Sequence, residues 1–189
     1  RALVRCAAAV EMIHAASLLH DDVIDGGHLR RGAPSFWTKK GVSGAILLGD
    51  LLVCKALQLL DGTNHGRLGA MLIRLAAEMC DAEVDQELVT CGTTRDWEKC
   101  VTIARSKTGS LFAFTAAATA GSDERQGDAL LEAGYRIGTA YQLADDLMDA
   151  CGEAVRAGKD LGKDAQKGKL TSVSASGGSD RPARQCIRN

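Results

Sequence analysis

The scarcity of proline sets the strongest limit on what this chain can fold into. Only two prolines occur among 189 residues, Pro34 and Pro182, so nothing interrupts the long segment between them. Alanine and leucine are abundant there, and apolar residues recur about every 3.6 residues, as on one face of a helix. We therefore predict an all-α fold. The expected helices cover 2–25, 44–61, 67–91, 95–105, 108–121 and 125–151, with a short one over 153–157.

The length suits one domain with its own hydrophobic core. From residue 174 the sequence SASGGSDRPARQCIRN has almost no apolar content, which is typical of segments that do not fold alone. We expect a core domain over 1–173 and a disordered tail over 174–189. The first residue is an arginine rather than a methionine, so we expect the chain to be a fragment.

Charge and cysteine usage exclude several classes of protein. The net charge is −1, which creates no overall field for nucleic acid or anionic membranes. The longest apolar stretches, such as SGAILLGDLLV, are too short to span a bilayer, and no signal peptide is visible. The seven cysteines form no C-x-x-C pair, and their odd number argues against a zinc site and a disulfide framework. We expect a cytoplasmic protein without a nucleic-acid partner or a transmembrane segment.

The acidic pattern D-D-x-x-D occurs twice, each time at the end of an expected helix. It is formed first by Asp21, Asp22 and Asp25, and again by Asp145, Asp146 and Asp149. Residues four apart share one face of a helix, so the first and last aspartate of each cluster point the same way. His14 and Gln142 precede the two clusters on nearly the same stripes.

A single acidic cluster is about as often solvated surface charge as a binding site. Binding is favoured here because the C-terminal end of a helix carries partial negative charge, so each carboxylate there costs about 0.3–1 kcal/mol. Apolar segments precede both clusters, so the acidic ends should border a cavity. Carboxylates without nearby histidine and cysteine ligands select hard cations, and Mg²⁺ keeps positions open for phosphate oxygens.

Basic residues follow both clusters. They are Arg30 and Arg31 after the first, Lys159, Lys163, Lys167 and Lys169 after the second, and Lys107 beside Thr108 between them. Each alone is most simply a solvated surface residue. Together with carboxylates that hold Mg²⁺, guanidinium and ammonium groups indicate a diphosphate site. The segment GKDLGKD lacks the Walker spacing and a preceding strand, which excludes a P-loop.

These motifs resemble those of the trans-isoprenyl diphosphate synthases, the polyprenyl synthetase family that includes farnesyl and geranylgeranyl diphosphate synthases. The resemblance runs from about residue 7 to residue 173. It is carried by EMIHAASLLHDDVIDGGHLRRG, GDLL at 49–52, KTGSLF at 107–112, YQLADDLMD at 141–149 and GKDLGKDAQKGK at 158–169, which follow the family's order.

The resemblance implies a homodimeric, all-helical bundle around a central cavity, with three Mg²⁺ ions per active site. It also implies a reaction in which an allylic diphosphate ionises and isopentenyl diphosphate attacks the cation, giving a prenyl diphosphate five carbons longer. By the same resemblance, the metal ligands are Asp21, Asp22, Asp25, Asp145, Asp146 and Asp149. The allylic diphosphate or its metals would be contacted by Arg30, Lys107, Thr108, Gln142, Lys159 and Lys169, and isopentenyl diphosphate by His14 and Arg31. Catalysis would rest on Asp21, Asp22, Asp25, Lys107, Asp145, Asp146 and Lys159.

The sequence departs from the family pattern at both ends. The family has further helices before residue 1, with a glycine–lysine and arginine segment for isopentenyl diphosphate, and more helices after KGKLT. Ala16 and Ser17 are small where short-chain enzymes often carry an aromatic residue, so we expect a product of twenty carbons or more. Two alternatives stay open: a truncated or non-catalytic partner subunit, and a class I terpene cyclase, which usually has a different second metal motif.

Overall fold

The computed structural model describes residues 2–61, 66–92, 96–121, 123–151 and 161–177. Two long helices come first, separated by a small hairpin: α1 (Ala2–Ile24), β1 (Leu29–Arg30), β2 (Ala33–Pro34) and α2 (Phe36–Leu60). The middle of the chain forms α3 (Gly66–Val84), η1 (Asp85–Val89), α4 (Trp97–Ala104), η2 (Arg105–Gly109), α5 (Ser110–Ala118) and α6 (Glu124–Cys151). Two short helices follow, α8 (Lys163–Lys167) and α9 (Ser172–Ala175). The prediction of an all-α fold is confirmed.

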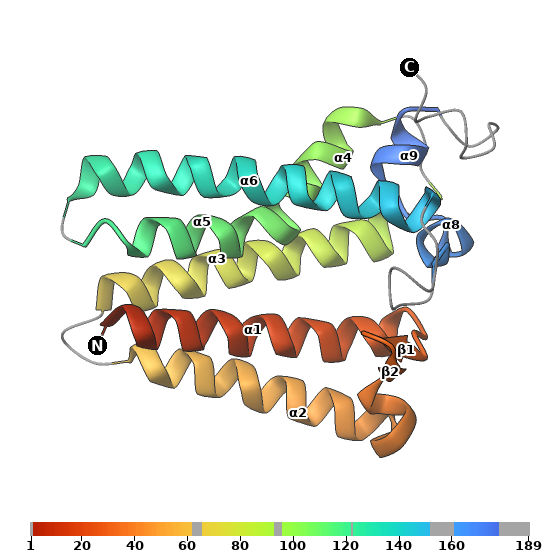
Figure 1. Ribbon diagram of the computed structural model, residues 1–189, viewed down its shortest axis with the longest axis horizontal. Coiled ribbons are helices and arrows are strands. Elements are labelled where there is room, and N and C mark those ends of the chain that lie inside the picture. Colours follow the sequence, from red (N-terminus) through yellow and green to blue (C-terminus); the bar gives the residue numbers. More distant parts are fainter. Residues whose placement is uncertain (1, 62–65, 93–95, 122, 152–160, 178–189) are drawn as a thin grey trace.

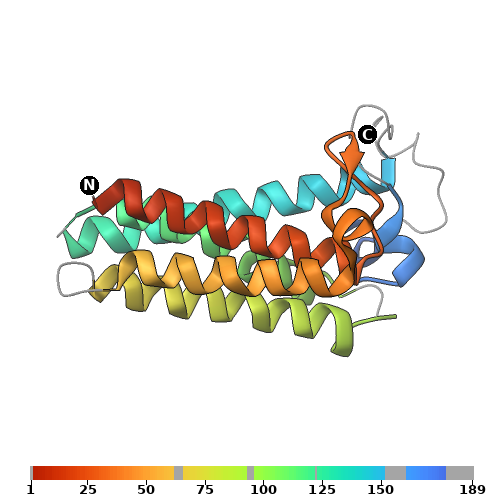
Figure 2. The same ribbon diagram turned by 90° about the horizontal axis from the view of Figure 1, so that it is seen from below.

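The long helices lie side by side along one axis (Figures 1 and 2). Helices α1, α3 and α6 all run toward the same end of the molecule, where the hairpin, α8 and α9 also lie. A hydrophobic core joins the layers, with Ile13 of α1, Leu72 and Leu75 of α3, and Phe114 of α5 almost fully buried. The fold therefore brings the C-terminal ends of three long helices together at one end of the bundle.

Several helix boundaries differ from those predicted. Helix α2 begins at Phe36 rather than at residue 44, with a kink at Gly41, whose φ of 77° and ψ of 165° are not helical. The segments η1 and η2 are π-helical: η1 lies near the end of the helix predicted over 67–91, and η2 covers the break between the helices predicted over 95–105 and 108–121. A π turn accommodates an additional residue and has no signature in hydrophobic periodicity. The helix predicted over 153–157 lies outside the described residues.

The β1–β2 hairpin was not predicted. Its strands are two residues long, and Arg31 and Gly32 at its tip have φ values of 52° and 74°. Positive φ at both central residues is the geometry of a tight hairpin turn that matches strand twist. Glycine adopts it easily, whereas arginine does so at some cost, so the turn is fixed by its surroundings.

Helices α5 and α6 approach each other closely through glycines. A Cβ atom added to Gly134 would lie 2.5 Å from the carbonyl oxygen of Phe112, and one added to Gly138 would lie 2.6 Å from Cα of Gly109. Such distances leave no space for a side chain. The backbones of η2, α5 and α6 therefore interlock, which fixes the second aspartate cluster relative to Lys107.

The expected boundary between core and tail falls inside a helix. Helix α9 runs across it, with a capping box formed by Thr171 and Ser174, and Ala175 is buried. The low apolar content of this segment predicted no helix, but the Ser/Thr pattern at 171–174 provides the N-terminal cap of one. Residues 178–189 lie outside the described part of the chain.

Helices α1 and α2 are long and apolar enough to cross a membrane by length and composition. The prediction that every apolar stretch is too short is therefore wrong by this test, because both stretches continue past the polar residues that interrupt them. An apolar helix of this length can also belong to the core of a folded domain. Helices α1 and α2 pack on each other, and α1 carries the first aspartate cluster.

Candidate active site

The first aspartate cluster lies at the C-terminal end of α1. Asp21 and Asp22 are in its last turns, and Asp25 follows immediately, with its amide donating to the carbonyl of Asp21 at 2.7 Å. Asp22 is buried and accepts hydrogen bonds on Oδ1 from Nε of Arg30 at 2.9 Å and Nη2 at 2.8 Å. The hairpin thus folds Arg30 back onto the cluster that precedes it.

The second cluster lies in the last turns of α6. Asp146 is buried and accepts from the Gln142 side-chain amide at 2.8 Å and from the amide of Ser172 at 2.9 Å. The hydroxyl of Thr108 donates to Oε1 of Gln142 at 2.5 Å. Asp149 is also buried and accepts from the amide of Gly162 at 3.1 Å. Asp145 is half-buried on the same turn.

Lysine side chains connect the two clusters. Nζ of Lys169 lies 2.8 Å from Oδ1 of Asp25, and its side chain is only 3% exposed. Lys167 lies 3.3 Å from the same oxygen. Lys107 interacts electrostatically with Asp21 on one side and with Asp146 on the other. The predicted juxtaposition of acids and bases therefore occurs at the end of the bundle where α1 and α6 terminate (Figure 1).

A third acidic element was missed by the sequence analysis. Glu83 at the end of α3 pairs with Lys107, and Glu87 in η1 pairs with Lys169. Gln86 between them accepts from Lys107 at 3.1 Å and donates to the carbonyl of Leu170 at 3.0 Å. The spacing of Glu83 and Glu87 repeats that of Asp21 and Asp25, and this could have been noticed in AEVDQELV.

Burial controls the protonation of this site. It raises the pKa of Asp21 to about 6, a shift that the charge of Lys107 only partly offsets. Burial also raises the pKa of Asp146, and that of Asp164 in α8 to about 6. Burial alone would raise the pKa of Asp25, but the hydrogen bonds and charges of Lys169 and Lys167 lower it overall. The site holds carboxylates that are stabilised by gaining a cation.

The donor chemistry of the site fits a hard divalent cation. The converging side chains offer carboxylate oxygens, and Oε1 of Glu83 is buried without a hydrogen-bond partner among the described residues. Within the described residues, no three acidic, histidine or cysteine side chains are already arranged to hold one metal ion. Asp25, which now faces lysine, would therefore have to turn toward a metal for the predicted ligand set to form.

Two of the predicted site residues that the structure describes lie outside this network. His14 is exposed on α1, and Arg31 is exposed at the hairpin tip. The stripe argument placed His14 near Asp21, but two turns of helix separate them along the axis. Lys159 lies outside the described residues.

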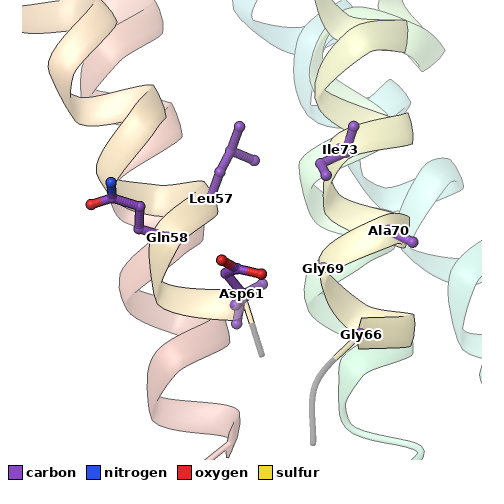
Figure 3. A pocket seen from close by; sticks show the side chains of 8 residues that line it. Leu57, Gln58, Asp61, Gly66, Gly69, Ala70 and Ile73 are labelled. Carbon is purple, nitrogen blue, oxygen red and sulfur yellow. The ribbon is translucent and has the colours of Figure 1, made fainter. Parts of the chain in front are cut away.

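Two hollows lie at different places in the fold. A small one of about 10 Å³ is lined by residues of the site, including Gln86, Lys107, Gln142 and Asp146. A larger one of about 670 Å³ lies between α2 and α3, where Figure 3 shows Leu57 pointing from α2 toward α3, with Asp61 and Ile73 nearby. Among the described residues that line the larger hollow there is no basic side chain, so this lining does not suit a diphosphate.

Comparison with known proteins agrees with this chemistry. The family model described as polyprenyl synthetase matches residues 1–187. The octaprenyl diphosphate synthase of Haemophilus influenzae is 33% identical over 171 residues, covering 89% of this chain and 52% of that protein. A short chain isoprenyl diphosphate synthase of Methanocaldococcus jannaschii is 34% identical, covering 88% and 53%.

A solved structure shares the fold. The polyprenyl synthase of Caulobacter crescentus, in a complex with calcium and isoprenyl diphosphate, matches with a TM-score of 0.85 and 35% identity, covering 95% of this chain and 57% of that one. The chain spans about half the length of the curated relatives it matches. The family model, the relatives and the shared fold lead to one conclusion: this chain belongs to the polyprenyl synthetase family.

Proposed function

We propose that this chain is the catalytic core of a Mg²⁺-dependent prenyltransferase, which condenses isopentenyl diphosphate with an allylic diphosphate to make a longer prenyl diphosphate. The observation that carries the proposal is the convergence of two aspartate clusters on Lys107 and Lys169. The relatives named above are prenyl diphosphate synthases, and the related Caulobacter structure holds calcium and isoprenyl diphosphate, which supports the use of a divalent metal.

The metal would be held by Asp21, Asp22, Asp25, Asp145, Asp146 and Asp149, with three Mg²⁺ ions as the expected number. Bound Mg²⁺ would neutralise the charge that develops on the departing diphosphate. Lys107, Lys169 and Arg30 would bind the phosphate oxygens of the allylic substrate. Thr108 and Gln142 form a hydrogen-bonded chain to Asp146, which orients that carboxylate. His14, Arg31 and Lys159 are proposed as further substrate contacts.

The apolar face of α1 below the first cluster would hold the prenyl tail and keep water from the allylic cation. Ala16 is buried and Ser17 is partly buried on this helix, and neither side chain is an aromatic that would shorten the space for a tail. We therefore propose a product of twenty carbons or more. The relatives include short-chain and octaprenyl synthases, so their names agree with more than one length.

We also propose that the protein works as a homodimer in the cytoplasm. Helix α2 exposes Val42, Ile46, Leu47 and Leu51, with Leu47 67% exposed, and such a surface suits a second copy of the chain. All six described cysteines are free, in keeping with a reducing compartment.

A product assay tests the proposed activity. The purified chain is incubated with Mg²⁺, isopentenyl diphosphate and, in turn, allylic diphosphates of ten, fifteen and twenty carbons. We expect elongation that stops when a chelator is added. The matched variant Asp21→Ala should lose roughly 10²-fold in rate, because one preorganised electrostatic element is removed. A folded chain that binds Mg²⁺ and diphosphate without turnover would instead favour the alternative of a truncated or non-catalytic partner subunit. Formation of cyclic hydrocarbons would favour a terpene cyclase.

A further inference from the structure

Both site lysines interact with acidic residues from two different segments of the chain. Lys169 contacts Asp25 from the α1 side and Glu87 from η1. Lys107 forms an ion pair with Glu83 at the end of α3 and interacts electrostatically with Asp21. Each lysine therefore lies between one carboxylate of the first cluster and one carboxylate of the α3–η1 segment.

This arrangement has a consequence when a metal enters. Asp21 and Asp25 are proposed metal ligands, so they would turn away from the lysines on loading. Glu83 and Glu87 lie on a different helix and would remain with Lys107 and Lys169. Their side chains are only 19% and 20% exposed, which keeps water from replacing these ion pairs.

We propose that Glu83 and Glu87 are positioning residues that hold Lys107 and Lys169 in the orientation in which they bind a diphosphate. The effect on diphosphate binding rests on the proposed function, whereas the two lysine–glutamate ion pairs are present in the structure whatever the function is. Lysine has a long flexible stem, and ordering it costs side-chain entropy at the moment of binding. A carboxylate that keeps the ammonium group in place removes that cost before the substrate arrives.

The π-helical geometry supports this role. Glu87 and Gln86 lie in η1, while Lys107 lies in η2, so the two segments face each other across the site. π turns occur frequently where a helix must aim side chains at a functional site. Gln86 adds a neutral acceptor to Lys107, at 3.1 Å, beside the charged one from Glu83.

The first experiment measures lysine positions in the metal-free protein. The full chain and the variants Glu83→Gln and Glu87→Gln are treated with an amine-reactive acylating reagent, and the modified lysines are quantified by mass spectrometry. We expect Lys107 to react several-fold faster in Glu83→Gln, and Lys169 in Glu87→Gln. The control Glu132→Gln removes an exposed ion pair with Arg105 and Arg136 outside the site, and should change neither rate. Unchanged reactivity of both lysines would overturn the proposal.

The second experiment measures binding of inorganic diphosphate with Mg²⁺ by calorimetry. Each Glu→Gln variant should bind roughly tenfold more weakly, as for loss of one charge-assisted contact. If only the net charge of the site mattered, each Glu→Gln variant would bind diphosphate more tightly, because removing a negative charge favours an anion. Conservative variants Glu83→Asp and Glu87→Asp should recover part of the affinity at an unchanged melting temperature.

Equal or tighter binding by the Gln variants would overturn the proposal. If lysine reactivity responds but the unaltered chain binds no diphosphate, Glu83 and Glu87 hold the lysines in place, but the role of that placement in diphosphate binding fails together with the proposed function. If the unaltered chain binds diphosphate but lysine reactivity does not respond, only the positioning role fails.

Discussion

The pair formed by Asp22 and Arg30 offers a sharp test of how the first cluster is stabilised. The Asp22 side chain is 7% exposed and that of Arg30 is 33% exposed, with two nitrogen atoms of Arg30 within 2.9 Å of one carboxylate oxygen. Removing one partner of a fully buried pair typically costs 3–5 kcal/mol, and exposed pairs contribute about 1 kcal/mol or less. Because this pair has one buried and one partly exposed partner, we expect Arg30→Met to lower the free energy of unfolding by about 2 kcal/mol.

A double-mutant cycle isolates the interaction. Unfolding by urea is followed for the unaltered chain, Arg30→Met, Asp22→Asn and the double variant. The coupling free energy should be about 1.5 kcal/mol, and Arg30→Met should lower the melting temperature by roughly 4–8 °C. Salt should reduce the coupling only slightly, because Asp22 is buried. A coupling free energy below about 0.5 kcal/mol would show that the pair with Asp22 does not hold Arg30, which would then be free to bind substrate.

Further predictions concern product length, helix packing and pH. Ser17→Phe should shorten the product identified by chromatography, because an aromatic ring would fill space one turn below the first cluster; an identical product profile would place the limit elsewhere. Gly134→Ala should destabilise the chain in thermal unfolding by about 1–3 kcal/mol, because its Cβ would lie 2.5 Å from a carbonyl oxygen, whereas Gly127→Ala, with 3.7 Å to its nearest neighbour, should be neutral or stabilising. With metal removed by a chelator, stability should fall as pH rises from about 4 to 6, because burial raises the pKa of Asp164 to about 6, so its protonated form favours the folded state. Asp164→Asn should make that dependence less steep, with Asp21, whose pKa burial also raises to about 6, still contributing, and a slope as steep as that of the unaltered chain would contradict the assignment.

Much of the fold followed from periodicity and from the absence of proline. Helix α6 was predicted to within a residue because its apolar pattern is long and uninterrupted. The β1–β2 hairpin was missed because its turn depends on positive φ at Arg31, which no propensity favours. The start of α2 was missed because Gly41, which interrupts it, looks like a loop residue when only the sequence is considered.

The site was predicted in part for a similar reason. Repeated acids and nearby bases are visible in the sequence, so Asp25, Lys107 and Lys169 were named before their contacts were known. Glu83 and Glu87 were missed because acids on an amphipathic helix look like solvated surface charge. Only the packing of α3 against η2 and the loop before α9 shows that they face lysines.

The two π-helical segments limit how the length of this chain can vary. Deleting one residue from 105–109 would allow α4 and α5 to join as a regular helix, but would rotate one relative to the other by about 100°. Gly109 would then leave its close approach to Tyr135, and Lys107 would turn away from Glu83. Insertions and deletions should therefore be tolerated in the loops that connect the helices and be selected against within these two turns, even where they leave every site residue in the chain.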